Sequence, residues 1–453
     1  MSAFWCEHAW LPGGVAARVR LELADGRFGS VTADTDPHSG DVRLAGLTLP
    51  GPANAHSHAF HRALRGRTHG GRGSFWTWRE RMYAAASRLD PDTYLTLARA
   101  AYAEMALAGW TVVGEFHYLH HAPGGTAYRD PNAMGAALVR AAAEAGIRLT
   151  LLDTLYLAGG LDADGHAPLD PVQRRFTDGR VGAWAARTAA LADGPLVRHG
   201  RAVHSVRAVP VRALHEVAGL RDGRPLHVHL SEQPAENEAC LAHYGLTPTG
   251  LLAEAALLGP ETTAVHATHL SAADIALLAD SGTGVCVCPT TERDLADGIG
   301  PARELADAGV PLSLGSDQHA VVDSFEELRT LEGHERLRSL ERGRFTAAEL
   351  LTSLSPNGYR ALGWPEGGRL LAGALADFTT VRLDSPRTAG SLPDQAPYAA
   401  TAADVTTVVV GGETVVSHGE HRLGDIGRLL GEAMTLLDAL SESPAGQEPE
   451  ARR

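Results

Sequence analysis

The sequence predicts a (β/α)8 barrel together with a small β-sandwich domain that is built from both chain ends. Between about residue 46 and residue 320, eight short apolar runs alternate with longer stretches, several of which have helical periodicity. Strands that alternate with helices pair in parallel through right-handed crossovers, and eight such units close into a barrel. Both flanks instead alternate apolar and polar residues with turns, which is typical of short antiparallel strands.

The elements are expected in the following order along the chain. Residues 1–48 supply the first part of the β-domain, 49–370 the barrel, and 371–425 the second part of the β-domain. Residues 426–453 are expected to form a C-terminal helix and a disordered tail, because SESPAGQEPEARR is polar and contains Pro and Gly. The eight barrel runs are LTLPGPANAH, TVVGEFH, LTLLDTLY, RAVHSVRAV, PLHVHL, TAVHATH, GVCVCP and PLSLGSD.

Composition limits the compartment and the partners. Four cysteines in 453 residues make no disulfide framework, so we expect a cytoplasmic protein, with Cys286 and Cys288 as plain buried strand residues. We find no secretory signal and no apolar run long enough to span a bilayer. The net charge of −14 argues against nucleic acid or a membrane surface as partner.

The chain contains no lysine, since all 40 basic residues are arginine. This absence excludes Schiff-base and pyridoxal phosphate chemistry, the P-loop lysine and a carbamylated-lysine metal bridge.

Four polar residues at strand ends predict one metal site. His56 and His58 form a His-x-His pair, and strand side chains two apart point to the same face. His229 ends the fifth run and Asp317 the eighth. Active sites of this fold lie at the C-terminal ends of the strands. Three imidazoles and a carboxylate suit one zinc ion per subunit, although Fe²⁺ or Mn²⁺ can use the same ligands.

Further residues at the same strand ends are candidates for proton transfer. Glu232 lies three residues past His229, where it can carry a proton from water to a leaving nitrogen. Asp317 is expected to accept a proton from the attacking water as well as to bind the metal. On the sixth run we predict that His269 faces the site, which leaves His266 as a core histidine or a supporting partner.

The blocks HSHAF, HVHLSEQ, HATHL and LGSDQH, in this order, resemble the mononuclear, deaminase-like branch of the amidohydrolase superfamily. The blocks NAHSHAFHRALRG, SFWTWRERMY, GEFHYLHH, HSVRAV and CPTTERDLADG are similar to the formimidoylglutamate deiminase family within it. The resemblance implies a zinc enzyme, a homodimer, that converts the dianion N-formimidoyl-L-glutamate to N-formyl-L-glutamate and ammonia in histidine degradation.

The same resemblance assigns residues. It implies metal ligands at His56, His58, His229 and Asp317, catalytic groups at Glu232 and His269, and substrate contacts at His61, Arg79, Tyr118, His204 and Arg207. Arginine is suited to bidentate carboxylate capture, which agrees with a dianionic substrate. Two places depart from the family: His61 stands where glutamine is usual, and RDLADG replaces a form closer to ANLGDG. His120 and His121 are left without a predicted role.

Two other functions compete with this prediction. A deaminase of a purine-type ring, such as guanine or an adenosine derivative, uses the same mononuclear metal site but needs an aromatic slot instead of two cationic anchors. The non-enzymatic alternative is an inactive barrel that acts as a binding protein. The complete set of ligands and proton carriers argues against inactivity.

Overall fold

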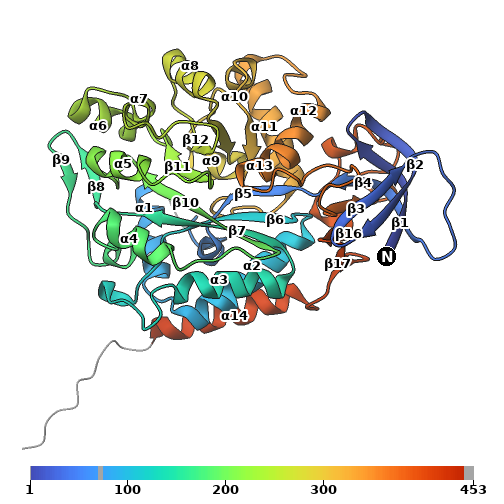
Figure 1. Cartoon of the computed structure of the whole chain (residues 1–453), viewed down its shortest axis with the longest axis horizontal. Coiled ribbons are helices and arrows are strands. Elements are labelled where there is room, and N and C mark those ends of the chain that lie inside the picture. The colour runs from blue at the N-terminus through green and yellow to red at the C-terminus, as the bar shows by residue number, and fades with distance from the viewer. Residues whose placement is uncertain (1, 70–74, 443–453) are drawn as a thin grey trace, which may run out of the picture.

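The computed structural model describes residues 2–69 and 75–442, and its centre is a barrel of eight parallel strands (Figure 1). In spatial order the strands are β5 (Ala53–Ser57), β6 (Val112–His117), β7 (Arg148–Leu155), β10 (Val197–Ser205), β11 (Leu226–Leu230), β12 (Thr262–His266), β13 (Gly284–Val287) and β14 (Leu312–Leu314). A parallel bridge between Ser57 and Asp317 joins the first and last strands. The predicted barrel is confirmed, and each predicted run overlaps one barrel strand.

Helices cover the outside of this barrel (Figure 1). They are α1 (Phe75–Ala86), α2 (Pro91–Leu107), α3 (Ala133–Ala145), α4 (Val181–Thr188), α5 (Val211–Ala218), α6 (Pro234–Tyr244), α7 (Pro248–Glu254), α8 (Ala272–Ser281), α9 (Pro289–Leu295), α10 (Ala302–Asp307), α11 (Ser324–Ser339), α12 (Ala347–Thr352) and α13 (Gly358–Ala361). After β7 the chain forms a short hairpin, β8 (Gly160–Asp162) and β9 (Gly165–Ala167), and then a 3₁₀ turn, η3 (Gln173–Phe176).

Local sequence signals begin and end several of these helices. Asp90 caps α2 by accepting from the backbone N–H of Thr93, and the Thr93 hydroxyl accepts in return from the backbone of Asp90. Ser271 and Asp274 form the same reciprocal pair at the start of α8. Gly282 ends α8 in the left-handed conformation, which is the common glycine stop.

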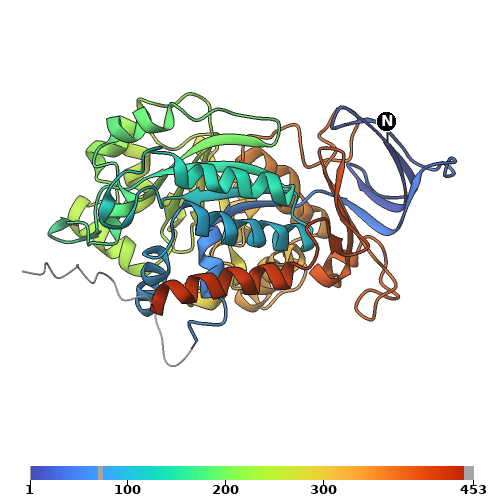
Figure 2. The ribbon, with the colours of Figure 1, turned by 90° about the horizontal axis from the view of Figure 1, so that it is seen from below.

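The two chain ends build a second sheet at one side of the barrel (Figures 1 and 2). Its strands, in spatial order, are β18 (Glu420–His421), β17 (Glu413–Ser417), β16 (Val405–Val410), β15 (Phe378–Val381), β4 (Val42–Pro50), β1 (Ser2–Leu11), β2 (Gly14–Ala24) and β3 (Arg27–Thr32). This sheet has its own apolar core, in which Phe4 and Phe28 from the N-terminal part pack on Phe378 from the C-terminal part. The predicted β-domain from both chain ends is confirmed.

A buried ion pair joins the two parts. Arg148 at the start of β7 donates to both carboxylate oxygens of Asp377, at 2.6 and 3.1 Å, just before β15. Both side chains are almost fully buried. Asp377 also accepts from the Tyr359 hydroxyl at 2.7 Å and from the backbone N–H of Gly411 at 2.6 Å. The carboxylate therefore ties the barrel to the β-domain.

The last helix, α14 (Ile426–Glu442), lies alongside α2 on the outside of the barrel (Figure 2). Leu430, Ala433 and Leu437 on one of its faces are buried in the main apolar core. The predicted C-terminal helix is therefore present, whereas the predicted disordered tail, 443–453, lies outside the described residues. In the part of the chain that the structure describes, no helix is long and apolar enough to cross a membrane.

Candidate active site

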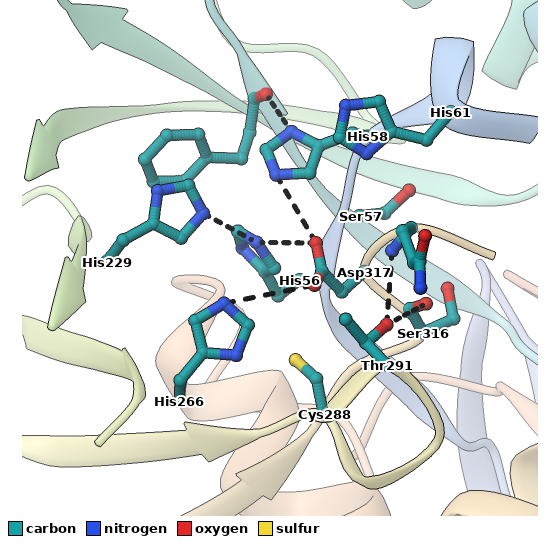
Figure 3. Close-up of polar contacts among 12 residues, drawn as sticks. His56, Ser57, His58, His61, His229, His266, Cys288, Thr291, Ser316 and Asp317 are labelled. Atoms are coloured by element: carbon teal, nitrogen blue, oxygen red, sulfur yellow. Dashed lines mark hydrogen bonds and ion pairs between the residues drawn. The ribbon is translucent and has the colours of Figure 1, made fainter. Parts of the chain in front are cut away.

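Three histidines and one aspartate point toward one another at the C-terminal end of the barrel (Figure 3). His56 and His58 come from the end of β5 and His229 from β11, and all three are buried. The Nε2 atoms of His56 and His229 lie 3.1 Å apart. One Asp317 carboxylate oxygen lies 3.4 Å from the Nε2 atoms of His56 and of His58.

Backbone carbonyls fix two of these rings. The Nδ1–H of His58 donates to the Phe116 carbonyl and that of His229 to the His204 carbonyl, both at 2.9 Å. A neutral imidazole that donates through Nδ1 presents the lone pair of Nε2, and here both lone pairs face the cluster. Burial lowers the pKa of His56 to about 3, which keeps this ring neutral too.

Asp317 reaches the cluster because the barrel closes tightly at this point. Its N–H donates to the His56 carbonyl at 3.0 Å. Gly315, two residues earlier, lies so close to His56 that an added Cβ would be 2.8 Å from the His56 carbonyl oxygen, so only glycine fits. Asp317 itself adopts the left-handed region with φ 42°. Burial alone would raise the pKa of Asp317, but the neighbouring histidines outweigh it and hold that pKa well below its usual range.

The four side chains fit a divalent metal ion by their donor atoms. Two Nε2 lone pairs, a third buried imidazole and a carboxylate oxygen converge on one space, and no arginine pairs with Asp317 among the described residues. This nitrogen and oxygen set matches the preference of zinc and is also acceptable to Fe²⁺ or Mn²⁺. The structure therefore brings the predicted ligands together.

Glu232 and His266 lie beside this cluster. The Nε2 atom of His266 is 3.7 Å from a Glu232 oxygen and 3.8 Å from the second Asp317 oxygen. On the other side of the ring, Nδ1 is 3.5 Å from Glu292. Burial alone would lower the pKa of His266, but Glu232, Glu292 and Asp317 raise it to about 10, so the ring holds a proton.

His269 does not reach the cluster, and the predicted placement of this residue is wrong. Its Nε2 bonds instead to the Asp297 carbonyl at 2.8 Å. The reason is that β12 ends at His266, where both His266 and Ala267 adopt left-handed backbone conformations with φ 70° and 52°. The chain turns out of the barrel there, so His266, and not His269, is the last inward-facing residue of the strand.

A pocket opens above the cluster, and all five predicted substrate-binding residues line it. His61 and Tyr118 hydrogen-bond to each other at 3.1 Å, beside the ring of His58. The His204 ring packs on Tyr156, with centroids 4.6 Å apart. Other lining residues are Trp78, Met82, Tyr83, Gly159, Phe176, Gln233, Glu236 and Leu295.

The two arginines reach this pocket from different elements. Arg79 on α1 donates through Nε to the Tyr83 hydroxyl at 2.8 Å and through Nη2 to the Gly159 carbonyl at 3.3 Å. Arg207, which follows β10, donates to Glu232 at 3.2 Å and lies 3.5 Å from Glu236. Two cationic groups thus share one pocket with the proton carriers.

Sequence reasoning missed two acidic residues of this site. Glu236, in the first turn of α6, is buried against Arg207, and burial raises its pKa despite that charge. Its spacing of four from Glu232 was the available signal. Glu292, in the CPTTE block, reaches His266 and accepts from the backbone N–H of Cys288 at 2.8 Å. Cys286 and Cys288 themselves are free and buried, as predicted.

Comparison with known proteins agrees with this geometry. The model of the amidohydrolase family matches residues 47–415, which include every residue described above at the site. The chain belongs to the amidohydrolase family. Since the family assignment and the deiminase and deaminase relatives agree, the protein is a hydrolase that acts on C–N bonds.

Individual relatives support the narrower resemblance. Formimidoylglutamate deiminase of Pseudomonas aeruginosa is 37% identical over 439 residues, which cover 93% of this chain and 96% of that protein. The 5-methylthioadenosine/S-adenosylhomocysteine deaminase of Natronomonas pharaonis is 31% identical over 91% of both chains. The 8-oxoguanine deaminase of Pseudomonas aeruginosa is 31% identical over 87% of both. The predicted resemblance to formimidoylglutamate deiminase is thus confirmed.

Solved structures share the whole fold. An amidohydrolase from Brucella melitensis superposes with a TM-score of 0.88 at 32% identity and covers 96% of this chain and 100% of its own. An adenosine deaminase from Xanthomonas campestris with bound zinc has a TM-score of 0.82 at 23% identity, with 97% and 98% covered. A zinc-bound protein is thus among the solved structures that share this fold.

Proposed function

We propose that this protein hydrolyses N-formimidoyl-L-glutamate to N-formyl-L-glutamate and ammonia, as a step of histidine degradation, with zinc as its metal. The single observation that carries the proposal is that Arg79 and Arg207 line the same pocket above the histidine and aspartate cluster. The substrate has two carboxylates on a flexible stem, and two arginines match them in charge and in geometry.

Each residue at the cluster has a part in this reaction. His56, His58, His229 and Asp317 would hold the zinc ion, which would supply Lewis acidity when bound. Asp317 accepts a proton from the attacking water, whose oxygen bonds to the formimidoyl carbon. Glu232 carries one proton to the terminal nitrogen, the second proton of the water follows through Asp317 as the carbonyl forms, the bond from carbon to that nitrogen breaks, and ammonia leaves. His266 donates to the oxygen that develops negative charge.

Anchoring both carboxylates holds the formimidoyl carbon over the cluster, so that binding at the remote end of the substrate becomes orientation at the reacting end. His61 and Tyr118, which hydrogen-bond to each other, border the pocket beside His58. We propose that these two residues and His204 contact the substrate between the metal and the arginines.

A second candidate is deamination of a purine-type ring. It is favoured by the names of two relatives, which act on 5-methylthioadenosine or S-adenosylhomocysteine and on 8-oxoguanine. The aromatic rings of Trp78, Tyr156 and Phe176 line the pocket as well. Arg79 and Arg207 together favour the linear dianion.

The deciding experiment measures ammonia release by zinc-loaded protein from N-formimidoyl-L-glutamate, N-formimidoyl-L-aspartate, guanine and 5-methylthioadenosine. We expect rapid release from the glutamate compound and a much smaller rate from the other three. Release from a purine alone would replace the proposal with the second candidate. If the zinc-loaded protein releases ammonia from none of the four compounds, both candidate functions are refuted.

A further inference from the structure

Gln173 lies behind the part of the pocket wall that is formed by Tyr83, Tyr156 and Gly159. It belongs to η3, and its side chain is buried, with 1% of the residue exposed. Its Nε2 lies 2.9 Å from the hydroxyls of both Tyr83 and Tyr156 and 3.0 Å from the Gly159 carbonyl. The side-chain amide therefore joins α1, which carries Tyr83, to the connection after β7, which carries Tyr156 and Gly159.

Two of these three acceptors are the groups that hold Arg79. The guanidinium donates to the Tyr83 hydroxyl and to the Gly159 carbonyl, and it lies over the Tyr83 ring with its central carbon 5.0 Å from the centroid. Gln173 and Arg79 thus share both acceptors. The amide therefore helps to hold the two oxygens to which the guanidinium donates.

The amide is itself fixed from behind. The Gln173 N–H donates to the Asp170 carboxylate at 2.8 Å, and the Gln173 Oε1 accepts from the Asp170 N–H at 2.9 Å. This reciprocal pair leaves both N–H bonds of Nε2 for the pocket wall. A buried amide with its partners in place is rigid, and removing it takes one hydrogen bond from each of the oxygens of Tyr83, Tyr156 and Gly159.

Gly159 is fixed as well. Its N–H donates to the Ala167 carbonyl at 2.9 Å, which closes the β8–β9 hairpin beneath the pocket. An added Cβ would lie 2.2 Å from the Pro168 carbonyl oxygen, so this position tolerates no side chain. The Gly159 carbonyl, which accepts from both Gln173 and Arg79, is therefore held in a fixed position.

We propose that Gln173 is a positioning residue that holds the Arg79 guanidinium in the orientation needed to bind one substrate carboxylate. The inference rests on the proposed function, since it assigns Arg79 to that carboxylate. Gln173 does not touch the reacting atoms and acts only through Tyr83 and Gly159. Its loss consequently weakens substrate binding and leaves the chemical step at the metal cluster intact.

The test replaces Gln173 by leucine, which has similar size and no hydrogen-bonding group. We expect Gln173→Leu to retain its zinc and raise KM for N-formimidoyl-L-glutamate about 10-fold, with kcat within about 3-fold of wild type. Calorimetric titration with the product N-formyl-L-glutamate gives a second readout that needs no turnover, and its Kd is expected to rise by the same factor.

A double-mutant cycle separates positioning of Arg79 from general damage to the pocket. In an Arg79→Met background, Gln173→Leu is expected to add almost nothing to Kd or KM. Tyr83→Phe removes the hydroxyl between the two residues without changing ring packing, and it is expected to reproduce the effect if the leucine variant folds poorly. Tyr398→Phe, which removes a remote hydroxyl bonded to the Phe345 carbonyl, is the matched control.

The possible results separate the role of Gln173 from the proposed function on which it depends. A wild-type enzyme that neither turns over N-formimidoyl-L-glutamate nor binds its product would refute the proposed substrate, and the inference with it. Normal wild-type activity with unchanged KM and Kd in Gln173→Leu and Tyr83→Phe would overturn the inference alone. Equal losses with and without Arg79 would overturn it too, because they show that Gln173 acts by another route.

Discussion

At the residue scale, the imidazole of His266 connects the acidic groups of the site. Glu232 and Asp317 approach its Nε2, and Glu292 approaches its Nδ1. These three carboxylates come from the segments that follow three different barrel strands, and the ring between them faces negative charge on both sides. A ring placed in this way can present a proton to the same space that the metal ligands face.

Replacing His266 and His269 one at a time tests this placement. His266→Asn is expected to lower kcat about 100- to 1000-fold, because a charge-stabilising donor is lost at the reacting oxygen. His269→Asn is expected to stay within about 5-fold of wild type, since that ring bonds to a backbone carbonyl outside the cluster. Steady-state kinetics of the two zinc-loaded variants decide. The opposite ranking would restore the assignment made from the sequence.

Replacing Glu232 by glutamine tests the proton path. Glu232→Gln keeps the size of the side chain and is expected to fold and bind zinc while losing about 100- to 10,000-fold in kcat. Metal analysis and circular dichroism serve as controls for the integrity of the site. Turnover near the wild-type rate in the zinc-loaded variant would remove Glu232 from the mechanism.

The cluster of candidate metal ligands was predictable at this scale because each of its members ends an apolar run. His56, His58, His229 and Asp317 all stand where a buried strand stops, and strand ends of a barrel meet. The choice between His266 and His269 was not predictable, since it depends on a left-handed turn at two residues that are not glycine. Propensity gives no warning of such a turn.

At the element scale, a buried network holds the segment that carries Tyr118. His117 and His120 flank Tyr118 and lie near Asp153 on β7. Their arrangement resembles a second metal site, but both Asp153 oxygens accept from Arg187 on α4 at 2.8 Å. A cation is disfavoured beside a guanidinium, so we assign this cluster to structure.

Arg187 also donates to Asp178 at 2.9 Å, and that carboxylate meets His121 at 3.2 Å. Burial alone would raise the pKa of Asp153, but the charges of His120 and Arg187 outweigh it and lower the pKa to about 2. The folded state therefore favours the ionised carboxylate. The resulting stabilisation is present above the ordinary carboxyl pKa of about 4 and is lost as the pH falls toward 2.

Arg187→Met is expected to lower the free energy of unfolding by about 3–5 kcal/mol at pH 7, because it leaves two buried carboxylates without their cation. The difference from wild type is expected to shrink as the pH falls from about 5 to 2, where the carboxylates become protonated. Urea unfolding over this pH range measures both effects. Arg212→Met, which removes only an exposed pair with Glu216, is the control and should change little.

Hydrophobic periodicity and the length of an apolar run do not predict where every strand begins and ends. The run LTLPGPANAH was predicted as one barrel strand, whereas the structure divides it between β4 of the outer sheet and β5 of the barrel. The end of β4 and all of β5 are buried, and the change of sheet occurs at Gly51 and Pro52 within a continuous run. The helix-to-strand alternation was sufficient for the barrel because it does not depend on such boundaries.

At the scale of the whole molecule, the buried pair of Arg148 and Asp377 joins the barrel to the β-domain, so we expect the two parts to unfold together. Arg148→Met is expected to reduce the free energy of unfolding by about 3–5 kcal/mol, since Asp377 stays buried without its cation. Denaturant unfolding, monitored with two different probes, measures this reduction in the free energy of unfolding. Arg382→Met, which removes an exposed pair with Asp384 in the β-domain, is the control. An unchanged midpoint for Arg148→Met would mean that apolar packing alone couples the two parts.

The first and last barrel strands, β5 and β14, are joined by the bridge between Ser57 and Asp317, and this affects the order of events in folding. Two of the candidate metal ligands, His56 and His58, precede nearly the whole barrel in sequence, and Asp317 follows it. An ion held by all four candidate ligands would act as a cross-link over a loop of some 260 residues, and loops of this length cost much chain entropy to close. A growing chain on the ribosome does not contain all four residues until its eighth barrel strand has been made, so these side chains come together late in folding. A bound ion would resist separation of the first and last strands, and we expect a chelator to loosen the barrel first where β5 meets β14.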